Sequence, residues 1–193
     1  CGVSPGQGCI IVVFHLWDGS LSGDPGSREA ALSLSLLRGG LPGARWLNVE
    51  NYHITLRFIG DIDGPTADGL IGAFDRIDRS SFSLTLSGLG SFGSKKPHSI
   101  WAGVSPSAEL KALQAEIERI CQRHGLAPDP RRFSPHVTLA RLRNARVADV
   151  VKYLGGRGDF NTLPFDVGRF VVMSSRDSVG GGPYLVEEAY SLG

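Results

Sequence analysis

The sequence predicts an α+β fold built from two similar halves. Segments with the two-residue alternation of strands alternate along the chain with segments of helical spacing. The tetrapeptide His-x-Thr-Leu occurs once in each half, at 53–56 and at 136–139, which favours an internal duplication. The 193 residues suffice for two lobes that share a core. We therefore expect a single domain over 1–193 made of two duplicated lobes.

In the first part of the chain, the hydrophobic pattern predicts two strands and two helices. The expected strands are 10–17, which is rich in β-branched and aromatic residues, and 50–60, which a short extended stretch at 44–48 precedes. The expected helices are 28–38 and 65–79. Ser27 is expected to cap the first helix, Gly39 and Gly40 to end it, and Pro65 to begin the second.

The rest of the chain continues the alternation of strands and helices. The expected strands are 82–89, 99–104, 136–142, 165–175 and 183–192. The expected helices are 107–124 and 147–155, of which the first has the clearest apolar stripe. We expect 82–89 to pair with 99–104, and the last two strands to pair around a turn at 176–182.

The composition limits the classes of partner. The 20 Lys and Arg nearly balance the 19 Asp and Glu, so the chain lacks the overall positive field that holds long duplexes, and nucleic acid is expected to be met locally. The three cysteines, Cys1, Cys9 and Cys121, have no metal-binding spacing and favour reduced thiols in the cytoplasm. The apolar run 9–17 is about half as long as a membrane span requires and predicts a buried strand. We expect no membrane partner.

The repeated tetrapeptide places an imidazole beside a hydroxyl. In a strand, residues i and i+2 point to the same face about 6.6 Å apart, so His53 and Thr55 share one face while Ile54 takes the other. The same holds for His136 and Thr138. Two such strands side by side would bring together two imidazoles and two hydroxyls.

This set of groups suits phosphodiester cleavage. A pair of histidines can hold one neutral ring as base and one protonated ring as acid near neutral pH. Because attack and departure at phosphorus are roughly in line, the base and the acid must stand on opposite sides, as His53 and His136 on separate strands would. Thr55 and Thr138 are candidates to hydrogen-bond the phosphate oxygens, and Arg141 to add a fixed positive charge.

Other interpretations of these residues are weaker. A lone strand histidine is more often structural than catalytic, and a duplicated fold can repeat a structural motif without chemistry. A metal site is disfavoured because no acidic or cysteine partner stands at ligand spacing beside either motif. Thiol catalysis by Cys121 is disfavoured because this residue lies on the apolar side of a helix.

The remaining histidines, aromatics and arginines receive structural interpretations. His15, His98 and His124 have no repeated context and are expected to be structural or surface residues. The aromatics expected in the core, with base stacking left open, are Trp46, Tyr52, Trp101 and Phe133. The basic cluster of Arg131, Arg132, Arg141, Arg143 and Arg146 is a solvated surface or a phosphate-facing patch.

With these motifs, the sequence resembles the two-histidine phosphoesterase superfamily, and within it the RNA 2′,3′-cyclic phosphodiesterases, also called 2′-5′ RNA ligase-like proteins. The similarity covers roughly residues 41–193. Its clearest segments are LPGARWLNVENYHITLRFIGDID, FSLTLSGLGSFG, SIWAGV, ELKALQAEIERICQRHGL and RRFSPHVTLARLR. The resemblance implies a bilobal pseudo-twofold fold, with antiparallel sheets lining a central cleft and helices outside.

The resemblance also implies an activity. Such an enzyme opens a 2′,3′-cyclic phosphate at an RNA end and leaves a 2′-phosphate, without metal, ATP or another cofactor. His53 would be the general acid toward the 3′ oxygen and His136 the base for water, while Thr55, Thr138 and Arg141 would hold the phosphate. The start of the chain departs from the family pattern, so the first-strand residue that meets the base is left open, with Phe14 as a candidate.

The expected partners are RNA ends or small nucleotide cyclic phosphates, and the expected state is a cytoplasmic monomer. Reverse 2′-5′ ligation stays open. Two alternatives remain beside RNA end hydrolysis. One is hydrolysis of another small cyclic phosphodiester, such as a cyclic phosphate of ADP-ribose. The other is an RNA- or nucleotide-binding module that has the same cleft but no turnover.

Overall fold

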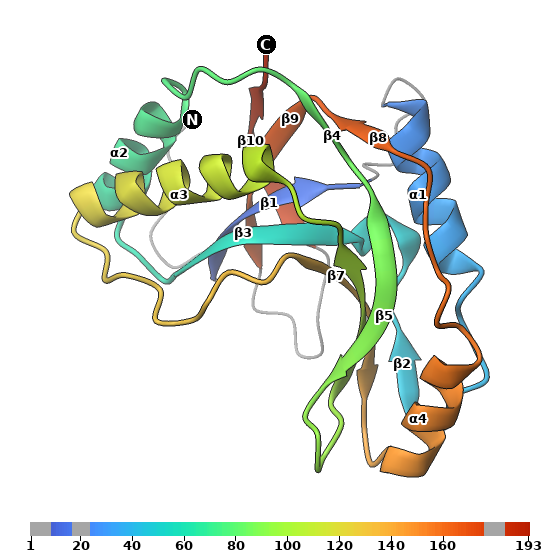
Figure 1. The fold of residues 1–193 in the computed structure, drawn as a ribbon. Coiled ribbons are helices and arrows are strands. Elements are labelled where there is room, and N and C mark those ends of the chain that lie inside the picture. The colour runs from blue at the N-terminus through green and yellow to red at the C-terminus, as the bar shows by residue number, and fades with distance from the viewer. Residues whose placement is uncertain (1–8, 17–23, 176–183) are drawn as a thin grey trace.

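The computed structural model describes residues 9–16, 24–175 and 184–193 (Figure 1). An eight-stranded antiparallel sheet has the order β10-β9-β1-β3-β7-β6-β5, with β2 also paired to β7. Its strands are β1 (Ile10–His15), β2 (Ala44–Trp46), β3 (His53–Gly60), β5 (Leu86–Phe92), β6 (Ser99–Val104), β7 (His136–Leu142), β9 (Arg169–Ser175) and β10 (Tyr184–Ser191). Strands β4 (Phe82–Leu84) and β8 (Phe165–Val167) form a second, two-stranded sheet. The prediction of an α+β fold with antiparallel sheets is confirmed.

The helices of the described chain pack on one face of the large sheet. They are α1 (Pro25–Ser35), α2 (Gly64–Phe74), α3 (Ala108–Arg123) and α4 (Val147–Gly155), with a short 3₁₀ helix, η1 (Val49–Asn51), before β3. One hydrophobic cluster joins all four helices to strand residues such as Val12, Ile54 and Val137. We call this side the helix face. The opposite side carries His53 and His136 and is called the histidine face.

Helix α1 begins earlier than predicted. Asp24 caps it, and the backbone N–H of Ser27 donates to Asp24 Oδ2 at 2.7 Å, so Ser27 lies inside the first turn instead of before it. The preceding Asp-Pro pair provides both an acceptor for the free N–H groups and a fixed φ at the first helical position. The helix also ends at Ser35, before the residues predicted to close it.

Helix α2 is shorter than predicted. Asp63 caps it by accepting from the backbone N–H of Thr66 at 2.8 Å, and the helix ends at Phe74 instead of near Arg79. Ile77 is still buried, because a turn after the helix directs it into the core. The apolar spacing therefore continued beyond the helix itself.

Two predicted strands are each divided in the structure. Segment 82–89 separates at Thr85 into β4 and β5, and segment 165–175 separates at Gly168 into β8 and β9. Strand β5 pairs with β6 as predicted, whereas β4 pairs with β8. Strand β1 ends at His15, and the predicted strand residue Trp17 lies outside the described residues.

Apart from the division of segment 165–175, the elements in the second half agree closely with prediction. Strand β7 and helix α4 have the predicted bounds, and α3 begins after the cap residue Ser107. The last two strands, β9 and β10, pair as expected, while their predicted turn lies outside the described residues. Among the helices of the described residues, none is long and apolar enough to cross a membrane.

The two sides of the sheet do not correspond to consecutive halves of the chain. Strands β9 and β10 return to the edge beside β1, far from β7, which precedes them in sequence (Figure 1). One side therefore contains β10, β9, β1 and β3, and the other contains β7, β6 and β5. The two motif strands, β3 and β7, meet in the middle.

Candidate active site

The two motif strands join at one antiparallel pair, Ile54 with Val137. Both side chains are fully buried on the helix face. Extending this register by one residue each way places His53 opposite Thr138. It likewise places Thr55 opposite His136. The structure therefore brings the four polar motif residues to one face of the sheet, each histidine beside the threonine of the other motif.

Each motif ends in a β-bulge at its leucine. On one side, Val13 pairs with Thr55 and Val12 with Arg57, so Leu56 is the extra residue. On the other side, Trp101 pairs with Thr138 and Ile100 with Ala140, so Leu139 is the extra residue. The bulges lie at the same place in both motifs.

The bulges reverse the direction of the residues that follow. By simple alternation, Arg141, five residues after His136, would face the helices. The bulge turns Ala140 into the core instead, and Arg141 pairs with Ser99 on the histidine face, where it is exposed. The structure thus places Arg141 on the side of His136 and Thr138.

Each histidine is held by a carbonyl two residues earlier. His53 Nδ1 lies 2.8 Å from the Asn51 carbonyl oxygen, and His136 Nδ1 lies 2.7 Å from that of Ser134. Because a carbonyl oxygen can only accept, each Nδ1 carries the hydrogen. In both rings Nε2 is therefore the nitrogen that gains or loses a proton.

Burial lowers the pKa of His53 from 6.5 to about 4, and the charges of His15, His136 and Arg141 lower it further within that shift. His53 is consequently neutral at neutral pH. His15, which we predicted to be structural or peripheral, pairs with His53 across β1 and β3. Nothing in the sequence indicated this contact, because it depends on the register of two strands.

Two aromatic side chains lie against His136. Phe92 meets it edge to face at 4.9 Å between ring centroids, and Trp101 lies at 6.1 Å. Trp101 is only half-buried and pairs with Thr138, so its predicted place in the core is wrong. Phe92, with no motif around it, was not predicted at all. His98 stacks on Phe92 at 6.2 Å and therefore also lies near the site.

Comparison with known proteins identifies the family. The family model described as the 2′-5′ RNA ligase superfamily matches residues 38–178. The chain belongs to the 2′-5′ RNA ligase superfamily. It is 39% identical over 135 residues to a protein of Aeropyrum pernix named RNA 2′,3′-cyclic phosphodiesterase, covering 68% of this chain and 76% of the relative. A protein of Aquifex aeolicus with the same name is 31% identical over 77% of this chain and 82% of its own length.

The fold of this superfamily member is similar to solved structures. The crystal structure of Escherichia coli LigT complexed with 3′-AMP superposes with a TM-score of 0.74 at 22% identity, covering 96% of this chain and 98% of LigT. At this identity the likeness supports the fold. The prediction of a two-histidine phosphoesterase fold is confirmed.

Phe14, the candidate first-strand residue for contact with a nucleotide base, lies in the core. It is buried on the helix face and stacks on Phe165 at 6.1 Å. Tyr52 is also fully buried, and Trp46 and Phe133 pack against the core as predicted. His124 bonds through Nδ1 to the Ile120 carbonyl oxygen at the end of α3, which agrees with a structural role.

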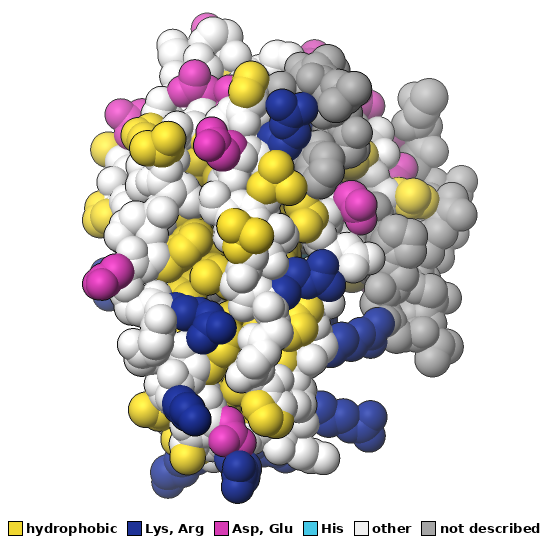
Figure 2. Space-filling model, turned by 90° about the vertical axis from the view of Figure 1, so that its right-hand side faces the viewer, with side chains coloured by type: hydrophobic (Ala, Val, Ile, Leu, Met, Phe, Trp, Pro, Cys, Tyr) yellow, Lys and Arg dark blue, Asp and Glu magenta, His cyan; other side chains and the backbone are white. Residues whose placement is uncertain are grey.

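The structure separates the predicted basic cluster, although all five arginines are exposed. Arg131 pairs with Asp129 beside β3, whereas Arg146 pairs with Asp149 at the start of α4. Seen from the side in Figure 2, Lys and Arg side chains gather in the lower half and most Asp and Glu in the upper half. The arginines therefore do not form one phosphate-facing patch.

Neither thiol catalysis by Cys121 nor a metal site gains support from the geometry of the described residues. Cys121 is fully buried, and burial raises the pKa of its thiol to about 11. Within the residues that the structure describes, no group of three or more His, Cys, Asp and Glu side chains is placed to hold a metal ion.

Proposed function

We propose that this protein hydrolyses the 2′,3′-cyclic phosphate at an RNA end to a 2′-phosphomonoester, with His53 and His136 as acid and base. The observation that carries the proposal is the pair of imidazoles with matching Nδ1 anchors, each opposite the other motif's threonine. The name RNA 2′,3′-cyclic phosphodiesterase, shared by relatives up to 39% identical, supports the same reaction.

The proposed step is one in-line displacement at phosphorus. Nε2 of His136 takes a proton from water, the water oxygen bonds to phosphorus, and the bond from phosphorus to the 3′ oxygen breaks. His53 gives its Nε2 proton to that oxygen, which leaves a 3′ hydroxyl and a 2′-phosphate. The hydroxyls of Thr55 and Thr138 donate to the phosphate oxygens, and Arg141 stabilises their charge.

The lowered pKa of His53 fits a general acid that becomes protonated when the substrate phosphate binds. His53 is neutral at neutral pH because burial, more than the positive charge of nearby Arg141, disfavours its charged form. A bound phosphate adds a negative charge beside the ring and raises its pKa. The acid is then formed only when there is a phosphate to cleave.

The wider setting is proposed on the same basis. The twin bulges at Leu56 and Leu139 support a single domain made of two duplicated lobes. The reaction as written needs no metal, ATP or other cofactor. The partners are RNA ends or small nucleotide cyclic phosphates, and we propose that the protein acts as a monomer in the cytoplasm, with reverse 2′-5′ ligation as a further activity to test.

The test is incubation with a nucleoside 2′,3′-cyclic phosphate in excess chelator, followed by identification of the product. We expect a nucleoside 2′-phosphate, and a loss of about 10²- to 10⁴-fold in rate for His53→Ala and for His136→Ala. His124→Ala, which removes a histidine at the end of α3, is the matched control and keeps full activity.

Three outcomes would contradict the proposal. Activity that chelator removes would indicate a metal-dependent reaction. A nucleoside 3′-phosphate product would reverse the assigned bond cleavage. Binding of the nucleotide without any turnover would indicate a binding module.

A further inference from the structure

Phe58 occupies the place in the first motif that Arg141 occupies in the second. Each residue lies five positions after its histidine and two after the bulge leucine. Phe58 pairs with Ile11, whose side chain belongs to the small hydrophobic cluster on the histidine face, so Phe58 also lies on that face. It is 42% exposed, unlike the bulky apolar residues on the other face of β3.

The guanidinium of Arg131 covers the Phe58 ring at 5.1 Å from its centroid. The guanidinium is held in place by Asp129, to which Nε donates at 3.0 Å and Nη2 at 2.9 Å. Arg131 keeps 66% of its side-chain surface exposed despite these bonds. A planar cation over an aromatic ring is thus fixed in place, with much of its surface open to solvent.

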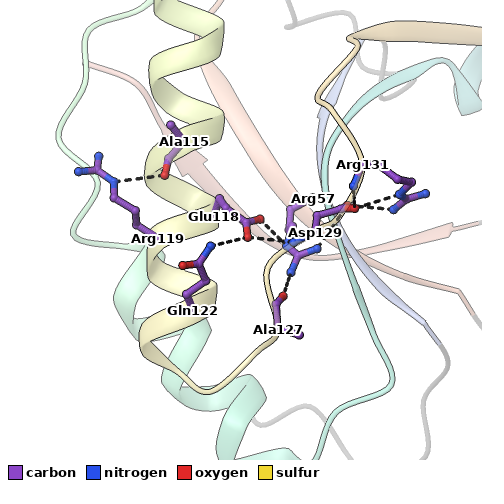
Figure 3. A network of polar contacts seen from close by, with 8 residues as sticks. All are labelled: Arg57, Ala115, Glu118, Arg119, Gln122, Ala127, Asp129 and Arg131. Carbon is purple, nitrogen blue, oxygen red and sulfur yellow. Dashed lines mark hydrogen bonds and ion pairs between the residues drawn. The ribbon is translucent and has the colours of Figure 1, made fainter.

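A buried arginine, Arg57, contacts Asp129 from the side of α3 (Figure 3). Arg57 Nε lies 2.8 Å from Glu118 Oε2 on α3, and its Nη1 lies 3.3 Å from Asp129 Oδ2. Its Nη2 donates to the Ala127 carbonyl oxygen at 2.5 Å. Asp129 is therefore held between Arg57 and Arg131, and Arg131 lowers the pKa of Asp129 to about 2, which keeps the carboxylate charged at neutral pH.

The stacked pair lies beyond the proposed phosphate site on the same face. Since β3 and β7 are antiparallel, the loop before His136 runs alongside the end of β3 that follows Thr55. Phe58 is three residues past Thr55, about 10 Å along the strand. Arg141 lies in the opposite direction, past Thr138. The two ends of the site thus differ: one offers an exposed cation, the other a stacked aromatic platform.

We infer that Phe58 and Arg131 form a stacking subsite for a base of the RNA chain upstream of the cyclic phosphate. The inference rests on the proposed function and adds that the protein prefers oligonucleotide ends to mononucleotides. Aromatic and guanidinium faces stack on any base. The subsite should therefore favour substrates with an upstream nucleotide, whatever the identity of its base. The difference between Phe58 and Arg141 gives a nearly symmetric site one orientation for its substrate.

The test compares a dinucleotide with a mononucleotide, both ending in a 2′,3′-cyclic phosphate. For Phe58→Ala and Arg131→Ala we expect kcat/KM to fall about 10- to 100-fold with the dinucleotide and to stay within about twofold with the mononucleotide. Phe58→Trp should retain the dinucleotide preference. Arg131→Lys, which keeps the charge and loses the plane, should lose most of it. Arg132→Ala, the exposed neighbour, is the matched control.

Calorimetric binding of a dinucleotide that ends in a 2′-phosphate provides a measurement independent of turnover. Weaker binding of this probe to Phe58→Ala than to the unsubstituted protein supports the subsite even if neither cyclic substrate is hydrolysed, an outcome that refutes the proposed function alone. Equal losses on both substrates, or unchanged binding and kcat/KM in both alanine variants, would overturn the subsite. Retained preference in Arg131→Lys would overturn the stacking role of Arg131.

Discussion

Leu56 and Leu139 occupy equivalent bulges on the two sides of the site. Each is the extra residue opposite a neighbouring strand, and each is buried in the same hydrophobic cluster, at 3% and 0% exposure. A bulge residue that must fill the core needs a large apolar side chain. This explains physically why the fourth position of both motifs is leucine, although leucine takes no part in the chemistry.

The titration of His53 should respond to bound phosphate. We expect its midpoint near pH 4 in the unliganded protein and a higher midpoint with a saturating nucleoside 2′-phosphate, because the phosphate charge favours the imidazolium. NMR of the imidazole C–H resonances against pH measures both values. Arg141→Ala should also raise the midpoint without ligand. A midpoint that ligand leaves unchanged would separate His53 from the phosphate.

His53 should also make the protein less stable at mildly acidic pH. Its pKa is about 4 in the folded protein and 6.5 without the fold, so between these values the unfolded state binds more protons. The contribution of His53 to the free energy of unfolding should therefore be fully present above about pH 6.5 and decrease as the pH falls toward 4. Urea denaturation at several pH values should show a smaller decrease in His53→Gln. Equal slopes would contradict the shift.

Gly90 should be required for the position of Trp101. An added Cβ would lie closer than 3 Å to three ring atoms of Trp101, which must then move away from His136. We expect Gly90→Ala to lower kcat/KM at least about fivefold and to destabilise the protein by about 1–3 kcal/mol. Gly72→Ala, in open space on α2, should instead stabilise it by about 0.5–1 kcal/mol. Full activity of Gly90→Ala would show that the ring position is unimportant.

Arg57 should contribute far more to stability than an exposed arginine of similar pairing. Arg57→Met leaves Glu118 and Asp129 without their buried cation, and we expect a loss of about 3 kcal/mol in the free energy of unfolding. Arg146→Ala removes an ion pair whose arginine is 80% exposed and should cost less than about 1 kcal/mol. Denaturant unfolding compares the two, and similar costs would contradict the buried network.

The thiol of Cys121 should be inert in the folded protein. Its full burial and its pKa of about 11 leave almost no accessible thiolate at pH 8. Treatment with iodoacetamide, followed by mass mapping, should find Cys121 unmodified and hydrolysis unchanged, whereas urea should expose it. Rapid labelling of Cys121 together with loss of activity would instead favour catalysis by the Cys121 thiol.

Local patterns were sufficient for most elements of this fold. The apolar stripe of α3 and the bounds of β7 and α4 follow from side-chain periodicity, which depends on neighbours close in sequence. The start of α1 was wrong because the Asp24-Pro25 cap precedes the Ser27 cap that we chose, and the end of α2 was wrong because the apolar spacing continues to Ile77, beyond the last helical residue. The division at Thr85 depends on β4 pairing with β8, a segment some eighty residues away, so no local pattern indicates it.

By itself, the sequence showed that the His-x-Thr-Leu motif occurs twice and that the histidine and threonine of each motif share one face of a strand, because strand alternation acts over two residues. Only the tertiary structure decided which strands meet, that Arg141 and Phe58 turn to the histidine face while Arg57 is buried, and that His15, Phe92 and Trp101 surround the imidazoles. Bulges and cross-strand registers are set by packing between segments far apart in the chain. A short motif therefore does not specify which strand it pairs with or in which register.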